Sequence, residues 1–487
     1  MGGLRYLCVS DLHLGASMSL MTHVDGQGRV SPDQPGPTLT ALATALRATV
    51  ARLAGDDPPT LVLIGDALDL GLSTTGEVGR AFLEFVDALF PANAPALFAP
   101  RLICMPGNHD HHLWRMAQDE QFVQAIENDG TMPHDLVQCT PLRNSAGLQC
   151  RLLTRLIRTR QHLAEAQVEI AYPNFAIIDD RGERGVILHH GHFIDAMYRS
   201  MSRLRAWLTD GSASLSTVDD IQSQNGAWID FLWSDLGSAG VIGEGIATLY
   251  ETMLDAGASH AFAELLSERL LAVLGKAFGV PPETAIAHGV TLAEVVRGLV
   301  DLTAGRAAES QRDGYRTVMG PGELADLRWY LNGPVAAQLS SDGLPLPREL
   351  AFVFGHTHKP FQDQIAIPPY KLPVSVYNIG GWVLDAPTMM ACQGAAIVLI
   401  DDDVNIASVR LFNDPINGEM ARVRVEGVGG FRDSENPLLA DAIRAVAATD
   451  VQWAAFSEAA LAAIRQRAAI DLGEFFHPNA VAAEAGA

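Results

Sequence analysis

Five short groups of carboxylate, amide and imidazole side chains occur in order along the sequence. Each group comes directly after a run of apolar residues that predicts a buried strand. The groups are Asp11-Leu12-His13, Gly65-Asp66-Ala67-Leu68-Asp69, Gly107-Asn108-His109-Asp110, His189-His190-Gly191-His192 and Gly355-His356-Thr357-His358. Taken alone, each group is more typical of a turn or a cap. Five of them predict one common site, because sites in open α/β sheets assemble at strand ends and in the loops beyond.

The residue types in these groups suit a metal site. Asp11 and His13 are two residues apart at a predicted strand end, so their side chains point the same way and can share one ion. Carboxylate, amide oxygen and imidazole ligands together suit Mn, Fe, Zn or Co. The groups contain no cysteine, which argues against a structural zinc site. The five cysteines of the chain are widely spaced, so no disulfide framework is predicted.

Apolar runs and helical periodicity alternate along the chain, which predicts an α/β layered fold. Strands are expected at residues 4–10, 61–64, 101–105, 175–178, 185–188, 350–354, 374–378, 395–400 and 422–428. Helices are expected at residues 38–53, 78–89, 243–256, 261–278 and 291–302, and in the alanine-rich C-terminal segment. The segment 110–172 is expected to be mostly helical.

A change to helical character after residue 197 predicts an inserted segment. We expect a catalytic domain formed by residues 1–197 and 346–430, a helical insertion at 198–345 and a helical C-terminal extension at 431–487. The insertion has the size of a small domain. Since it falls between the fourth and fifth groups, it could cover the site as a cap. Its apolar helices could instead pack against another subunit or a membrane surface.

Composition narrows the class of protein. The chain has 487 residues, of which 48% are hydrophobic and 19% charged, as in ordinary globular proteins. The formal net charge of −23 disfavours generic binding to nucleic acid, which needs clustered Lys and Arg. No run of about 18 apolar residues predicts a transmembrane helix. The first residues enter a predicted strand without the features of a secretory signal, so a cytoplasmic location is expected.

The five groups resemble the calcineurin-like metallophosphoesterase superfamily, whose pattern is DxH, GDxxD, GNH(D/E), a His before Gly, and GHxH. The resemblance implies an α/β four-layer sandwich of two mixed β-sheets flanked by helices. It also implies two divalent metal ions and attack by a hydroxide that bridges them. The ligands implied for the first ion are Asp11, His13, Asp66 and His358, and those for the second are Asp66, Asn108, His190 and His356. Asp66 would bridge the ions, His109 would protonate the leaving oxygen, and Asp69 would hold the ring of His109.

Other polar residues near these groups have two interpretations each. His192 could contact substrate or metal, or take neither role. Arg199 could clamp a substrate phosphate, or lie on a solvated helix face. Asp110 could be catalytic, or could cap the following helix. His189 alternates to the opposite face of its strand and is expected to be structural.

The predicted function is a dinuclear-metal-dependent phosphohydrolase that cleaves a phosphodiester, phosphomonoester or pyrophosphate bond. Asp69 is followed by Leu70-Gly71, and the third group ends in Asp110, whereas protein phosphatases of the superfamily usually carry GDxxDRG and GNHE. This departure favours a small phosphorylated substrate, such as a nucleotide or a lipid-linked phosphate. The alternatives are a nuclease of the same superfamily and a non-catalytic binding protein. The sequence does not determine the substrate, the oligomeric state or the identity of the metals. Manganese is one of the candidate metals.

Overall fold

The computed structural model describes most of the chain. The described residues are 2–26, 28–71, 73–129, 132–143, 148–208, 215–235, 264, 267–268, 271, 281–287, 290–300, 318–384, 389, 392–412, 422–428 and 436–469. The predicted helix 243–256 and most of the predicted helix 261–278 lie outside these residues.

The first sheet has seven strands in the order β16-β15-β14-β1-β4-β5-β6. Their bounds are β1 Leu4–Val9, β4 Thr60–Ile64, β5 Arg101–Met105, β6 Gln167–Ile170, β14 Ala395–Asp401, β15 Ile406–Phe412 and β16 Arg424–Glu426. Strands β1, β4, β5 and β6 are parallel, whereas β14 pairs with β1 in the antiparallel sense. The carboxyl ends of the parallel strands therefore meet at one edge, where the first three groups follow.

The second sheet has five strands in the order β12-β13-β11-β8-β7. Their bounds are β7 Asn174–Ile178, β8 Arg184–His189, β11 Glu349–Phe354, β12 Phe361–Ile365 and β13 Val374–Asn378. The three central strands are parallel, and the edge strands β7 and β12 are antiparallel to their neighbours. Both sheets are thus mixed, and the predicted fold class is confirmed.

Alternation along the strands builds a core on each side of the first sheet. In β1, Cys8 faces the second sheet and shares a buried cluster with Leu188 and Val353. Leu7 belongs to the other buried cluster, which also contains Leu42 of a flanking helix. Since successive side chains of a strand point to opposite faces, an almost continuously apolar strand is buried on both sides.

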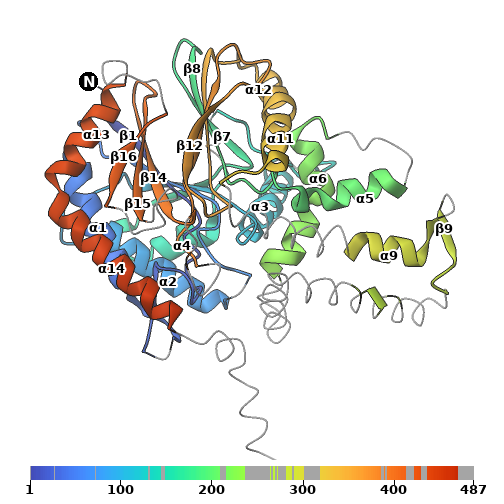
Figure 1. Cartoon of the computed structure of the whole chain (residues 1–487), viewed down its shortest axis with the longest axis horizontal. Coiled ribbons are helices and arrows are strands. Elements are labelled where there is room, and N and C mark those ends of the chain that lie inside the picture. Colours follow the sequence, from blue (N-terminus) through green and yellow to red (C-terminus); the bar gives the residue numbers. More distant parts are fainter. Residues whose placement is uncertain are drawn as a thin grey trace, which may run out of the picture.

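Helices cover the outer faces of the two sheets (Figure 1). On the side of the first sheet lie α1 Pro37–Val50, α2 Thr75–Leu89, α13 Pro437–Ala448 and α14 Asp450–Ala468, and on the side of the second sheet lie α11 Pro321–Tyr330, η6 Leu331–Val335 and α12 Ala336–Ser341. Helix α2 begins with a capping box, in which the hydroxyl of Thr74 accepts from the amide of Glu77 at 3.3 Å and the Glu77 carboxylate accepts from the amide of Thr74 at 3.2 Å. The Tyr330 hydroxyl, which donates to the Asn174 side chain at 3.1 Å, ties α11 to the second sheet.

The remaining elements lie in the connections. They are β2 Thr22–Val24, β3 Val30–Pro35, α3 His112–Asp129, α4 Arg151–Ile157, η1 Gln161–Leu163, η2 Ala196–Arg199, α5 Ser200–Leu208, α6 Val218–Ile229, η3 Asp230–Asp235, β9 Ala285–Ala287, β10 Val290–Thr291 and α9 Leu292–Val300. The expectation of mostly helical structure at 110–172 omitted strand β6, which is short and alternates polar with apolar residues. Strands β12 and β15 were not predicted either.

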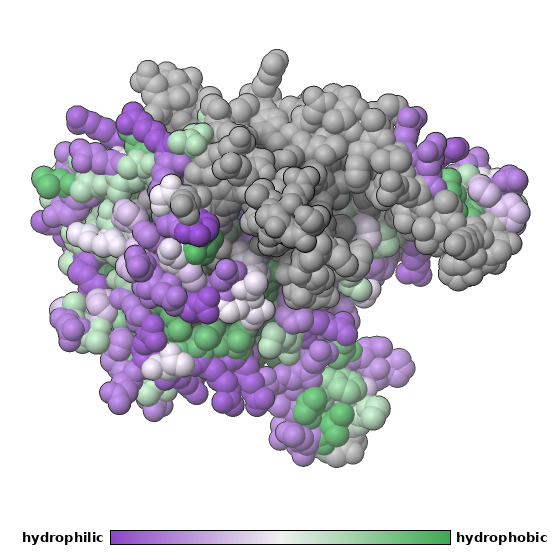
Figure 2. Space-filling view, turned by 90° about the horizontal axis from the view of Figure 1, so that it is seen from below, coloured by the Kyte–Doolittle hydropathy of each residue, from purple (hydrophilic) through white to green (hydrophobic). Residues whose placement is uncertain are grey.

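Polar side chains dominate the face shown in Figure 2, where small apolar areas lie among hydrophilic ones in the coloured part of the surface. Among the described residues, the exposed large apolar side chains are spread over several elements, as Val123 of α3 and Val451 of α14 illustrate. Among the described helices, none is long and apolar enough to cross a membrane.

Candidate metal centre

The five groups meet at one end of the sandwich. Three follow β1, β4 and β5 of the first sheet, and two follow β8 and β11 of the second. The amide of Asp11 donates to the carbonyl oxygen of Gly65 at 3.0 Å and joins the first two loops. The amide of His356 donates to both carboxylate oxygens of Asp11, at 3.1 and 3.0 Å, and joins the two sheets. The ligand loops are therefore held by one another as well as by their strands.

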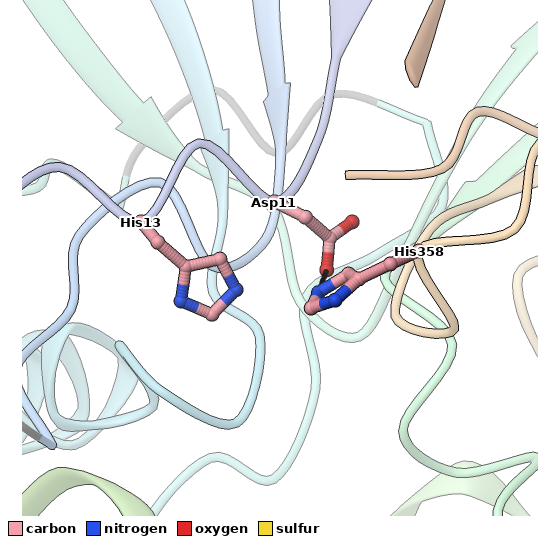
Figure 3. A group of neighbouring side chains, drawn as sticks. All are labelled: Asp11, His13 and His358. Carbon is pink, nitrogen blue, oxygen red and sulfur yellow. Dashed lines mark ion pairs between the residues drawn. The ribbon is translucent and has the colours of Figure 1, made fainter. Parts of the chain in front are cut away.

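Asp11, His13 and His358 form one group of possible ligand atoms (Figure 3). All three atoms lie within 4.8 Å of one another, as a single bound cation requires. Nε2 of His358 lies 3.4 Å from Oδ1 of Asp11. Nε2 of His13 is buried and has no hydrogen-bond partner among the described residues. A buried nitrogen without a partner is costly, and a bound cation would satisfy it.

Asp66, His190 and His356 form a second such group. Nε2 of His190 lies 3.2 Å from Oδ2 of Asp66 and 3.1 Å from Oδ1 of Asn108. The Nδ1 atom of His190 lies 3.1 Å from the carbonyl oxygen of Ile64, to which it donates, so Nε2 is left as the ligand atom. Oδ2 of Asp66 also lies 3.8 Å from Nε2 of His13 in the first group. The Asp66 carboxylate therefore stands between the two groups.

A third group joins His13 and His109 through Asp69. Oδ2 of Asp69 lies 3.1 Å from Nδ1 of His13, and Oδ1 lies 3.3 Å from Nδ1 of His109. The amide of His109 donates to Oδ1 of Asp66 at 2.7 Å. One carboxylate thus orients both a predicted metal ligand and the predicted acid.

The backbone is strained at the predicted ligands. Six residues other than glycine have a positive φ angle in the described part of the chain, and five of them are predicted ligands. These five are Asp11 at 51°, His13 at 45°, Asp66 at 47°, His356 at 69° and His358 at 53°. Residues with a Cβ atom rarely adopt this conformation, and its concentration at one site points to a functional constraint.

Two glycines leave the space that the ligand side chains occupy. A Cβ atom on Gly355 would lie 2.1 Å from Oδ2 of Asp11, and one on Gly107 would lie 2.3 Å from Oδ1 of Asp66. Both distances are far below van der Waals contact. The glycines that precede the ligands in the third and fifth groups are therefore a steric requirement of the site.

The comparison with protein families agrees with this geometry. A family model described as calcineurin-like phosphoesterase matches residues 4–275, more than half of the chain. The chain belongs to this family. Calcineurin-like phosphoesterases are metal-dependent hydrolases, which makes this chain an enzyme of that class. A search of curated proteins finds no match. The fifth group, which carries His356 and His358, lies beyond the matched residues, and the structure brings it to the other four.

In this phosphoesterase, buried carboxylates and imidazoles shift one another's pKa values against the effect of burial. Burial alone would raise the pKa of Asp66, but the charges of His190 and His109 hold it well below its usual value. Burial alone would lower the pKa of His109, but the charges of Asp69 and Asp66 raise it to about 9. In the same way, Asp66 and Asp11 raise the pKa of His190 to about 9. The carboxylates thus concentrate negative charge where cations would bind.

Three imidazoles of the candidate metal centre are partly exposed to solvent, whereas the ligands between them are buried. The side chains of His109, His356 and His358 are 13%, 12% and 13% exposed, respectively. Those of Asp66 and His190 are 3% and 0% exposed. A substrate would therefore approach over the three partly exposed imidazoles.

Asp110 joins two ligand loops and does not cap α3 through its side chain. Its carboxylate accepts from the amides of Gly107, Asp66, Ala67 and Leu68, at 2.7, 3.2, 2.9 and 3.2 Å. The helix-cap interpretation was wrong, because the side chain turns back to the loop after β4. Asp110 fixes the loop of Asp66 against the loop of Asn108.

His192 and His189 lie behind the candidate metal centre. The His192 side chain is fully buried, and its Nε2 atom lies 3.2 Å from the hydroxyl of Tyr172. His189 is also fully buried, and its ring packs on those of Tyr330 and Phe352. Neither imidazole belongs to the ligand groups of the described residues.

Arg199 is buried between elements of the predicted insertion. One guanidinium nitrogen lies 2.8 Å from Asp326 and 3.1 Å from the carbonyl oxygen of Ile194, and the group lies 4.4 Å from the Trp329 ring centre. The solvated-face interpretation was wrong, because only 5% of the residue is exposed.

Further side chains lie beside the candidate metal centre, Asp195 just before the predicted insertion and Tyr198 and Trp233 within it, and sequence reasoning missed them. Oδ2 of Asp195 lies 3.4 Å from Nε2 of His356. The Tyr198 ring packs 5.2 Å from the His356 ring, and the Trp233 ring packs 5.3 Å from the His109 ring. No strand-end motif marks these residues, so the sequence offered little signal for them.

Proposed function

We propose that this phosphoesterase holds two divalent metal ions and hydrolyses a phosphodiester, phosphomonoester or pyrophosphate bond of a small substrate. The observation that carries the proposal is the position of Asp66. Its Oδ2 atom lies 3.2 Å from His190 in one ligand group and 3.8 Å from His13 in the other. A carboxylate so placed suits a bridging ligand between two neighbouring cations.

The donor atoms fit divalent cations. Asp11, His13, Asp66 and His358 would hold one ion, and Asp66, Asn108, His190 and His356 would hold the other. The unpartnered Nε2 atom of His13 supports this assignment. The bound ions would supply Lewis-acid chemistry, which activates water and neutralises charge on the phosphoryl oxygens. The mixture of carboxylate, amide and imidazole suits Mn²⁺ as the first ion to test.

His109 is the proposed proton donor to the leaving oxygen. It is partly exposed on the side from which a substrate would approach, with 13% of its side chain accessible. Its Nδ1 atom contacts Asp69 at 3.3 Å, which leaves Nε2 to face the substrate. Asp69 and Asp66 raise the pKa of His109 against the effect of burial, so the ring carries the proton that the leaving group needs.

A small substrate is proposed on two grounds. The net charge of −23 opposes long polyanions, and the insertion supplies side chains close to His356 and His109. A nucleotide or a lipid-linked phosphate meets these conditions. Side chains this close to the predicted ligand His356 and to the predicted acid His109 would leave little room for a bulky substrate.

Hydrolysis of bis-p-nitrophenyl phosphate by protein stripped of metal and resupplied with Mn²⁺ tests the proposal. We expect activity that depends on metal, two bound ions per chain, and loss of both in Asp66→Ala. The control is Asp119→Ala in α3, where the carboxylate is 61% exposed and pairs with Arg115 in the same helix. Two bound ions without hydrolysis of this diester, of p-nitrophenyl phosphate or of pyrophosphate would overturn the proposal.

A further inference from the structure

The short helix η3, in the predicted insertion, lies against the loop that carries His109. The ring of Trp233 is centred 5.3 Å from the ring of His109, at an angle of 37°. Trp233 is 6% exposed, so its indole is fixed within the protein. The neighbouring Ser234 hydroxyl donates to the carbonyl oxygen of Asn108 at 3.0 Å. Two consecutive residues of η3 therefore contact two consecutive residues of the loop after β5.

The loop after β4 holds η3 from another direction. A Cβ atom on Gly71 would lie 2.3 Å from the carbonyl oxygen of Trp233 and 3.4 Å from Nδ1 of His109. The backbone of Gly71 thus packs directly on η3 beside the acid. The amide of Leu70 donates to the carbonyl oxygen of His109 at 3.2 Å, which ties the same loop to the acid.

We propose that Trp233 is a positioning residue that sets the orientation of the His109 ring. The inference rests on the proposed role of His109 as proton donor. Asp69 contacts one nitrogen of the ring at 3.3 Å, and the His13 ring lies against it in a T-shaped arrangement, with the ring centres 4.7 Å apart. The indole of Trp233 is a third contact and limits the tilt of the ring about the Asp69 contact. Together the three contacts set the direction of Nε2.

Through Trp233, the predicted insertion would affect how well His109 donates its proton. Positioning of an acid within hydrogen-bond reach is the first condition of general-acid catalysis. Small displacements of a catalytic group lower rates strongly. Because Trp233 comes from the predicted insertion, the packing of that segment would set the orientation of the acid.

The test compares two diesters that differ in the need for a proton. Diphenyl phosphate releases the more basic phenolate, whereas bis-p-nitrophenyl phosphate releases a weakly basic anion. We expect Trp233→Leu to lower kcat/KM for diphenyl phosphate about tenfold and for bis-p-nitrophenyl phosphate less than about threefold. Trp233→Phe, which keeps a ring against His109, should retain most activity toward both. An equal loss toward both diesters would overturn the proposal.

A double-mutant cycle separates positioning from general damage. In a His109→Ala background, Trp233→Leu should have no further effect on diphenyl phosphate, because the group that it positions is absent. Additive losses would refute the proposal. The control Trp453→Leu removes a buried indole from α14, whose Nε1 atom donates to Thr49, and should change both diesters by one common factor.

A crystal structure of Trp233→Leu gives a readout that needs no activity. We expect the His109 ring to leave its contact with Asp69 or to occupy several orientations, while His190 and Asp66 stay in place. An unchanged His109 ring would sink the inference even if the enzyme proves active. Absence of metal-dependent hydrolysis in the wild type would sink the proposed function instead, and the ring orientation would still decide the structural claim.

Discussion

Replacement of Asp69 by asparagine is the most informative single perturbation of the site. The two carboxylate oxygens of Asp69 contact Nδ1 of His13 at 3.1 Å and Nδ1 of His109 at 3.3 Å. Asparagine offers one acceptor oxygen and one NH₂ donor. The NH₂ group faces an imidazole N–H whichever way the amide is turned, so Asp69→Asn loses one of the two contacts.

The magnitude follows from the lost contact. A hydrogen bond to a charged group contributes about 1.5–3 kcal/mol, which corresponds to about a 10- to 150-fold loss of rate. The pKa of His109 changes too. Burial lowers it, but Asp69 and Asp66 raise it to about 9. Without the Asp69 charge it falls toward the usual value of about 6.5. Only the protonated ring donates, so activity disappears at a lower pH.

The assay is the pH dependence of kcat/KM for diphenyl phosphate at saturating metal, with bound metal measured in parallel. We expect the alkaline limb of the Asp69→Asn profile to move to lower pH. Loss of metal instead would show that the contact with His13 is the one broken. An alkaline limb at its wild-type position, with metal retained, would refute the role given to Asp69. The control is Asp119→Asn, on an exposed part of α3.

Three further predictions concern the ligand loops and the buried histidines. Gly355→Ala should lower bound metal, measured by elemental analysis, because its Cβ atom would lie 2.1 Å from a carboxylate oxygen of Asp11; full metal content would contradict this. Mn²⁺ at about 100 times its dissociation constant should stabilise wild type by about 2.7 kcal/mol for each occupied site in urea unfolding, and His190→Ala should lose the share of the site that His190 helps to form. Burial holds the pKa of His189 well below its usual value. As the pH falls, the unfolded chain therefore takes up a proton at this histidine before the folded chain does. Below about pH 6.5 the free energy of unfolding should fall by about 1.4 kcal/mol per pH unit from this residue. His189→Leu should reduce this slope, and an unchanged slope would contradict the role given to His189.

The most accurate predictions from the sequence were the strands whose ends are marked by local residue patterns. Strands β5 and β13 have the predicted bounds, because both are short segments rich in β-forming residues between clear turn signals. Edge strands with polar residues were missed, as in β12, where two glutamines flank Asp363. Strand β12 is stabilised by its pairing with β13, which a local sequence pattern does not show.

The walls of the candidate metal centre could not be predicted in the same way. Asp110 satisfies four amides from two loops, a role that depends on the distance between those loops in space. Trp233 lies 124 residues after His109 in the chain, and only the packing of η3 brings them together. Motifs identify residues at strand ends, whereas these contacts arise from the tertiary arrangement of the connections.

The bond between His356 and Asp11 has a consequence for biosynthesis. The two residues are 345 positions apart, and the carboxylate of the first accepts the amide of the last ligand loop. At a synthesis rate of about 5–20 residues per second, that separation takes roughly 20–70 s. During this interval the early carboxylates and imidazoles are present on the ribosome without their partners. The complete set of predicted ligands is therefore present only after the fifth group has been synthesised.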